Sequence, residues 1–84
     1  MAKLNKKEIR KKFREAVFKR DNNMCRICGK DGPLDAHHII NRNCFENGGY
    51  ELDNGISLCE ECHLKAENLE YSETYLYDLI KELI

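Results

Sequence analysis

Residues 54–63 read Asn-Gly-Ile-Ser-Leu-Cys-Glu-Glu-Cys-His and contain the second of two Cys-x-x-Cys pairs in this 84-residue chain. Cys25 and Cys28 form the first pair, and Cys59 and Cys62 form the second. Two such pairs are typical of a tetrahedral zinc site with four thiolate ligands. The competing interpretation is a redox Cys-x-x-Cys, but that motif needs a neighbouring βαβ pattern, which is not visible here. We therefore predict a structural Zn²⁺ on these four cysteines.

Length and composition indicate one small domain over residues 1–84, because this size cannot hold two separate cores. A core this small is marginal, and a structural metal would offset that weakness. No apolar run approaches the roughly 18–20 residues that span a bilayer. The basic N-terminus lacks the apolar region of a secretory signal, and five cysteines argue against a disulfide framework. We expect a cytoplasmic protein without membrane association.

Charge is distributed unevenly along the chain. Residues 1–20 hold nine Lys and Arg against two Glu, whereas residues 60–84 hold seven acidic and two basic residues. A basic arm on a protein whose net charge is only −1 suggests attraction to an anionic polymer, most simply nucleic acid. Taken alone, the arm is better explained as the solvated face of a helix.

The periodicity predicts helices at both ends of the chain. Asn5, followed three residues later by Glu8, is a plausible N-cap pair for a helix over 6–20, and the polar run 21–23 ends it. Its apolar residues recur at helical spacing: Ile9, Phe13, Ala16 and Val17. Ser72 is a candidate N-cap for a C-terminal helix held by packing on the domain or on a second copy. Its apolar residues are Leu76, Leu79, Ile80 and Leu83.

The middle of the chain predicts a zinc knuckle and two short strands. The order is a knuckle over 24–30, a strand over 34–40, a polar loop over 41–50, a hairpin-type turn over 53–55, a strand over 56–58 and a helix from Cys59 to about Asn68. The fold class is thus small α+β, with a basic N-terminal helix (1–22), a zinc-bearing core (23–68) and a C-terminal helix (69–84).

All three histidines, His37, His38 and His63, lie within or beside the cysteine framework. Adjacent helical residues point about 100° apart, so if Cys62 faces the zinc, His63 faces elsewhere. Glu67 lies one turn after His63 on the same face, and the two could offer a nitrogen and an oxygen to a second, divalent metal.

Several of these residues also have simpler explanations. Neighbours on a regular strand face opposite sides, so His37 and His38 serve one site only if the strand twists or ends there. Asp35 could then replace His37 as a ligand. Asn54 by itself is explained by an Asn-Gly turn, and Glu67 by itself is an ordinary solvent-facing charge.

The combined pattern closely resembles the HNH endonucleases in their zinc-bearing ββα-metal form. The runs that carry the resemblance are Asp35-Ala36-His37-His38-Ile39, Asn54-Gly55-Ile56-Ser57-Leu58-Cys59 and Cys62-His63. The resemblance implies that His38 is the general base and that His37 and His63 are ligands of the catalytic metal. It also implies that Asn54 orients the base. Glu67 occupies the place where some members have another histidine ligand.

We therefore predict a metal-dependent DNA endonuclease of the prokaryotic or phage type, with one catalytic cation (Mg²⁺, Mn²⁺, Ni²⁺ or Zn²⁺). Histidine suits the base because its unperturbed pKa lies near neutrality. Candidate phosphate contacts are Arg42 and the helical residues Lys7, Lys11 and Arg14. The alternative is a zinc-stabilised module that binds nucleic acid without cutting it. A homodimer or a larger partner through the C-terminal helix is also open.

Overall fold

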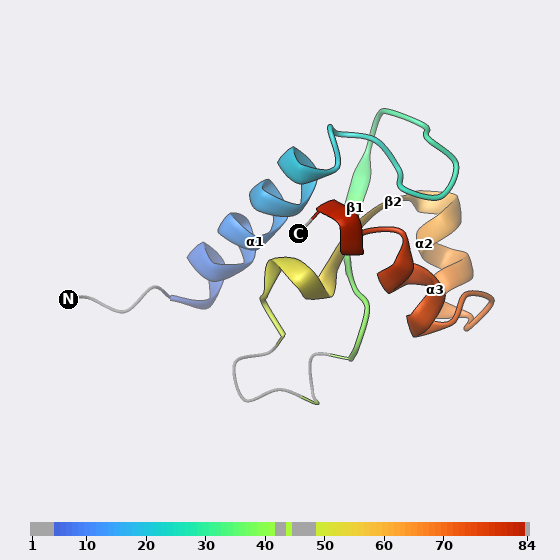
Figure 1. Ribbon diagram of the computed structural model, residues 1–84. Coiled ribbons are helices and arrows are strands. Elements are labelled where there is room, and N and C mark those ends of the chain that lie inside the picture. Colours follow the sequence, from blue (N-terminus) through green and yellow to red (C-terminus); the bar gives the residue numbers. More distant parts are fainter. Residues whose placement is uncertain (1–4, 42–43, 45–48, 84) are drawn as a thin grey trace.

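The structure, a computed structural model, describes residues 5–41, 44 and 49–83 (Figure 1). It is the small α+β fold expected from the sequence. The elements are helix α1 (Lys6–Arg20), strand β1 (Leu34–His38), the 3₁₀ turn η2 (Leu52–Asn54), strand β2 (Gly55–Cys59), helices α2 (Glu60–Glu67) and α3 (Glu73–Asp78), and the 3₁₀ turn η3 (Lys81–Leu83).

The two strands form an antiparallel sheet in which Leu34 pairs with Cys59 and His38 pairs with Gly55. All five residues of β2 are buried. On one face, Ile56 and Leu58 join the main hydrophobic core with residues of α2, α3 and the cysteine cluster. On the other, the Ser57 hydroxyl donates to the main-chain oxygen of Val17 in α1 at 3.4 Å. Strand β2 is therefore covered by helices on both faces.

Helix α1 has the predicted bounds and the predicted cap. The Asn5 side chain accepts a hydrogen bond from the Glu8 N–H at 2.8 Å, which satisfies one of the free amides of the first turn. Phe13 and Val17 are buried against the sheet. Ala16, which the periodicity also assigned to the apolar face, is exposed. The buried face of the helix is therefore narrower than predicted.

Asp21, directly after α1, is fully buried and joins this helix to β2. Its carboxylate accepts two hydrogen bonds from the Arg20 guanidinium, at 2.7 and 2.8 Å, and one from the Ser57 N–H at 2.9 Å. Arg20 also donates to the carbonyls of Leu52 and Gly55, at 2.7 and 2.6 Å. The end of the helix is thus fastened to both sides of Asn54.

Two local predictions were wrong. Strand β1 ends at His38 rather than Ile40. The Ile39 N–H still donates to the main-chain oxygen of Asn54, but the Asn54 N–H donates to the Glu51 carbonyl within η2 and not back to Ile39. Residues 53–55 do not form a hairpin turn: Gly55 is extended, with φ −118°, and already belongs to β2. The connection between the strands instead runs from 39 to 54. The Asn54-Gly55 pair lies at the end of this connection and does not form its turn.

Ser72 caps the C-terminal helix as predicted, but that α-helix ends at Asp78, and Lys81–Leu83 form a 3₁₀ turn. Cys59 caps α2, and the Ser72 side chain caps α3 by accepting from the Tyr75 N–H at 3.0 Å. Leu76 and Ile80 are fully buried in the main core, so α3 packs on its own domain. A second copy docking through the C-terminal helix stays a prediction. In the described part of the chain, no helix has the length and apolar character of a membrane-spanning segment.

We predict that Asp21→Ala destabilises the domain by about 3–5 kcal/mol, because it leaves the buried Arg20 charge without its partner. Denaturant unfolding at constant zinc measures this change. Asp31→Ala is the matched control, since Asp31 is exposed and surface substitutions usually stay within about 0.5 kcal/mol. Equal stability of the two variants would contradict the role given to Asp21.

Candidate metal centre and histidine cleft

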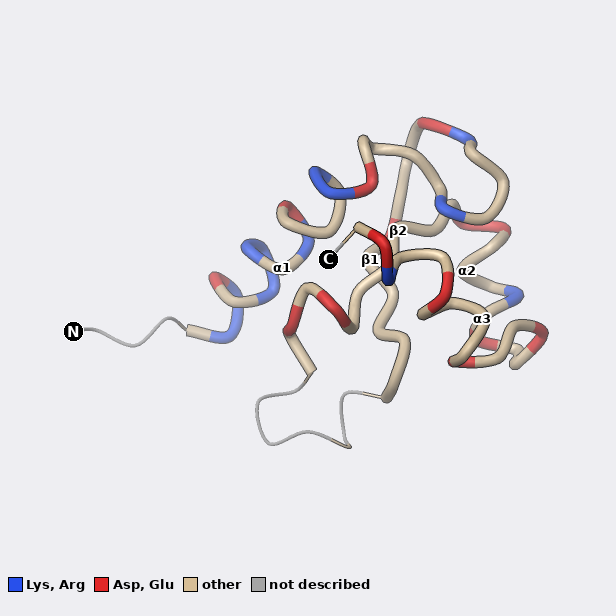
Figure 2. Tube along the Cα trace, viewed as in Figure 1, with Lys and Arg blue, Asp and Glu red and all other residues tan. Residues whose placement is uncertain are grey.

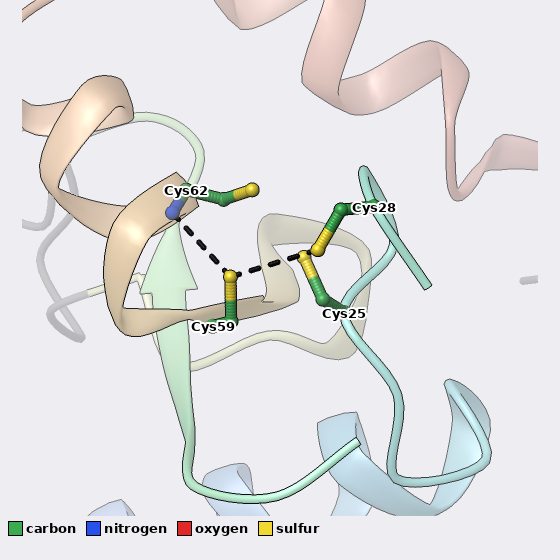
Figure 3. A group of neighbouring side chains, drawn as sticks. All are labelled: Cys25, Cys28, Cys59 and Cys62. Atoms are coloured by element: carbon green, nitrogen blue, oxygen red, sulfur yellow. Dashed lines mark hydrogen bonds between the residues drawn. The ribbon is translucent and has the colours of Figure 1, made fainter. Parts of the chain in front are cut away.

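The four predicted zinc ligands come together at one point (Figure 3). The sulfur atoms of Cys25, Cys28, Cys59 and Cys62 all lie within 4.8 Å of one another. The Cys28 and Cys59 sulfurs are 3.7 Å apart, and none of the five cysteines forms a disulfide. Zn–S bonds of about 2.3 Å place tetrahedral sulfurs roughly 3.8 Å apart. The donor set and its spacing therefore fit one tetrahedral zinc ion.

Local backbone geometry aims the sulfurs. In the knuckle, the Gly29 N–H donates to the Cys25 carbonyl and the Cys25 N–H donates to the Lys30 carbonyl, both at 2.9 Å. Gly29 has φ +76°, a conformation that glycine adopts without strain. In the second pair, Cys59 ends β2 and its sulfur accepts from the Cys62 N–H at 3.5 Å, in the first turn of α2.

Two thiols of the cluster, those of Cys25 and Cys62, have strongly perturbed pKa values. Burial opposes ionisation of Cys25, but hydrogen bonds from the backbone of Cys28, Cys59 and Ile27 outweigh it and lower the Cys25 pKa to about 6. Burial and the neighbouring cysteines raise the pKa of Cys62. Burial of thiols whose pKa is raised, as at Cys62, is offset when a cation binds, because metal binding deprotonates the ligand thiols.

The three histidines and Glu67 border a second, separate depression, whereas Asn54, the other predicted catalytic residue, does not line it. A shallow cleft of about 270 Å³ is bounded by Ala36, His37, His38, Asn41, His63 and Glu67. Both strand histidines border it, and His38 is the last residue of β1. Asn41 was not among the predicted site residues, and nothing in its sequence context singles it out.

His63 lies between two carboxylates. Its Nδ1 is 3.1 Å from an oxygen of Asp35, and its Nε2 is 3.3 Å from an oxygen of Glu67. The His37 and His63 rings are 5.2 Å apart between centroids. Asp35 and His37 were alternatives in the sequence, and both lie beside His63, since residues two apart on a strand share a face.

Burial, with the nearby His63 as a smaller contribution, lowers the pKa of His37 to about 4. His37 is therefore neutral at physiological pH, the state in which an imidazole nitrogen can bind a metal. Nitrogen and carboxylate donors suit a divalent cation, so the chemistry of this set fits the expected one. Within residues 5–41, 44 and 49–83, however, only the four cysteines form a closely gathered ligand group. The donor atoms of the histidines and Glu67 are less closely gathered than the four sulfur atoms.

Asn54 is buried and ties down both ends of the segment that follows β1. Its side chain accepts from the Ile40 N–H at 2.9 Å and donates to the carbonyls of Ile40 and Gly49, at 3.1 and 3.2 Å. These contacts fix the backbone two residues after His38. The position of Asn54 is thus explained by hydrogen bonds that a simple Asn-Gly turn would not make.

Lys7, Lys11 and Arg14 are exposed on one face of α1 and border a surface hollow of about 520 Å³. Figure 2 shows basic residues concentrated along α1 and acidic residues along the C-terminal half. The Arg14 guanidinium also lies 5.8 Å from the centre of the Phe18 ring. Arg42, the other predicted phosphate contact, lies outside the described residues.

Comparison with known proteins gives one match. The model of a protein family described as HNH endonuclease matches residues 25–69, which include both cysteine pairs and all three histidines. No curated protein and no solved structure matches the chain.

We predict one tightly bound zinc per chain, which elemental analysis of purified protein measures. Cys59→Ala removes one of four thiolates and should lose both zinc and the cooperative melting transition, because binding of a structural zinc is coupled to folding. Cys44→Ala is the matched control, since Cys44 is exposed and lies outside the cluster. Folded wild-type protein without zinc would contradict the site.

Proposed function

Because the chain belongs to the HNH endonuclease family, we propose that it is a metal-dependent endonuclease that hydrolyses phosphodiester bonds of DNA. The observation that carries this proposal is the cleft in which His37, His38, His63 and Glu67 meet. Three imidazoles and a carboxylate around one open depression provide both a proton acceptor and ligands for a cation. A purely structural zinc domain would require neither.

In this proposal His38 is the general base. It accepts a proton from the water that attacks phosphorus, a role that an imidazole commonly fills at neutral pH. Asn54 positions this base indirectly, through the backbone of Ile40. The cleft that His38 borders is open, so a phosphodiester can enter it from solvent, although the Nε2 atom of His38 is itself buried.

His37, His63 and Glu67 would hold one divalent cation, which when bound neutralises charge on the scissile phosphate and the leaving oxygen. Asp35 supports His63 from its other ring nitrogen, 3.1 Å away, as carboxylates commonly do for metal-binding histidines. The site is open and has few ligands, so its ion should exchange readily, unlike the zinc on the four thiolates.

Helix α1 supplies the attraction to DNA. Lys7, Lys11 and Arg14 follow one another at spacings of four and three residues, which places them on one helix face. Cations in such a row can contact successive phosphates without reading the sequence. The same basic face would also serve the alternative function, a module that binds nucleic acid and cuts nothing.

We predict that His38→Ala lowers the rate of supercoiled-plasmid nicking by about 100- to 10,000-fold, the usual contribution of a general base. The assay is run across Mg²⁺, Mn²⁺, Ni²⁺ and Zn²⁺ with EDTA as the control. Zinc content and DNA affinity should stay near wild type, because His38 is not a ligand of the cysteine site.

Equal nicking by wild type and His38→Ala would refute the assigned base. DNA binding by a wild-type protein that cuts with none of these metals would favour the non-catalytic module instead.

We predict that replacing Lys7, Lys11 and Arg14 by Ala weakens DNA binding and flattens its salt dependence. Each lost phosphate contact should reduce the slope of log K against log salt by about 0.9. Fluorescence anisotropy at several salt concentrations measures this slope. Lys81→Ala is the control, since Lys81 lies in the acidic C-terminal region and pairs with Asp78 at 3.2 Å. An unchanged slope in the triple variant would show that these three residues do not contact DNA phosphates.

A further inference from the structure

We propose that Phe13, in helix α1, is a positioning residue for His38 and that Tyr50 completes an aromatic clamp on this imidazole. The inference rests on the proposed function, because it takes His38 as the base. Phe13 lies outside residues 25–69, the segment that matches the family. The clamp would therefore make the N-terminal helix part of the catalytic apparatus.

The strand register explains how a helix residue reaches the base. His38 pairs with Gly55 across the sheet, and directly paired residues point to the same face. A side chain at 55 would occupy the place beside the His38 ring. A Cβ built there would lie 2.6 Å from the tip of the Phe13 ring and 2.5 Å from a methyl of Val17. The glycine thus leaves room for Phe13.

Gly55 has an extended backbone that any residue can adopt, so a left-handed conformation does not explain why a glycine stands at this position. The space it leaves is the physical reason for a glycine here. Phe13 fills that space and is itself buried, with 7% of its surface exposed.

The three rings pack as a clamp. The Phe13 and His38 rings are stacked, with centroids 4.8 Å apart and planes 10° apart. Tyr50 meets His38 edge-on at 5.0 Å and meets Phe13 edge-on at 5.5 Å. Both arrangements are favourable for aromatic pairs. With one face covered and one edge held, the His38 ring has little freedom to rotate about its side-chain bonds.

The clamp is anchored at the far end of the helix. Arg20 and Asp21 fasten α1 to the carbonyls of Leu52 and Gly55 and to the Ser57 N–H. Phe13 therefore cannot withdraw from His38 without breaking a buried charge network. Because misplacement of a catalytic group by about 1 Å can cost about 100-fold in rate, a fixed ring plane has a direct catalytic benefit.

The test compares Phe13→Leu with Val17→Ala in single-turnover plasmid nicking. Leu keeps apolar bulk at the interface but removes the stacked ring. Val17→Ala removes buried volume from the same interface one turn away, without a ring contact to His38. We expect Phe13→Leu to lower the cleavage rate at saturating protein by about tenfold or more, with DNA affinity unchanged. Val17→Ala should lower thermal stability but keep the wild-type cleavage rate.

A second readout is independent of activity. Stacking on Phe13 should shift the carbon-bound His38 ring protons upfield in the NMR spectrum, and only Phe13→Leu should abolish this shift. If wild type cuts and Phe13→Leu cuts equally fast, or if Val17→Ala slows cutting as much, the clamp is refuted while the nuclease stands. Absence of the ring-current shift in wild type also refutes it. If the wild-type protein fails to cut DNA with every metal tested, both proposals are overturned.

Discussion

The convergence of four sulfur atoms within 4.8 Å is the constraint on which the rest of this domain depends. It joins the knuckle, the end of β2 and the first turn of α2, three segments that a core of this size would hold only weakly. It also sets the rotation of α2. Since Cys62 faces the cluster, the next residue, His63, is turned by about 100° toward β1, where it meets Asp35 and His37. The structural centre thereby orients a proposed ligand of the catalytic cation.

Helix α1 combines two tasks on different faces. Phe13 and Val17 pack on the sheet beside Gly55, while Lys7, Lys11 and Arg14 remain exposed. A rigid helix with one face against the proposed base and another toward solvent would link phosphate contacts to the geometry of the cleft. The buried Arg20–Asp21 pair makes that link stiff, because removal of either partner leaves a charge without compensation.

The end of β1 reconciles two requirements that a regular strand cannot meet. His37 turns toward His63, and His38 stacks on Phe13 from the opposite side, as alternation demands. Both nevertheless border one cleft at the end of β1, where Asn54 bonds to the backbone of Ile39 and Ile40. The buried Asn54 side chain, through its three hydrogen bonds, thus fixes the backbone that follows β1 beside the cleft.

The sequence by itself determined the elements that depend on local chemistry. The bounds of α1, the caps at Asn5 and Ser72 and the four-cysteine cluster all follow from short spacings and side-chain types, and the structure confirms them. The histidine set was also predicted, and the structure gathers it at one cleft, although its catalytic roles stay predictions. Tertiary structure decided what long-range packing controls. The burial of Asp21, the close packing at Gly55 and the rings around His38 depend on contacts between residues some 12 to 42 positions apart, and no local periodicity encodes such contacts.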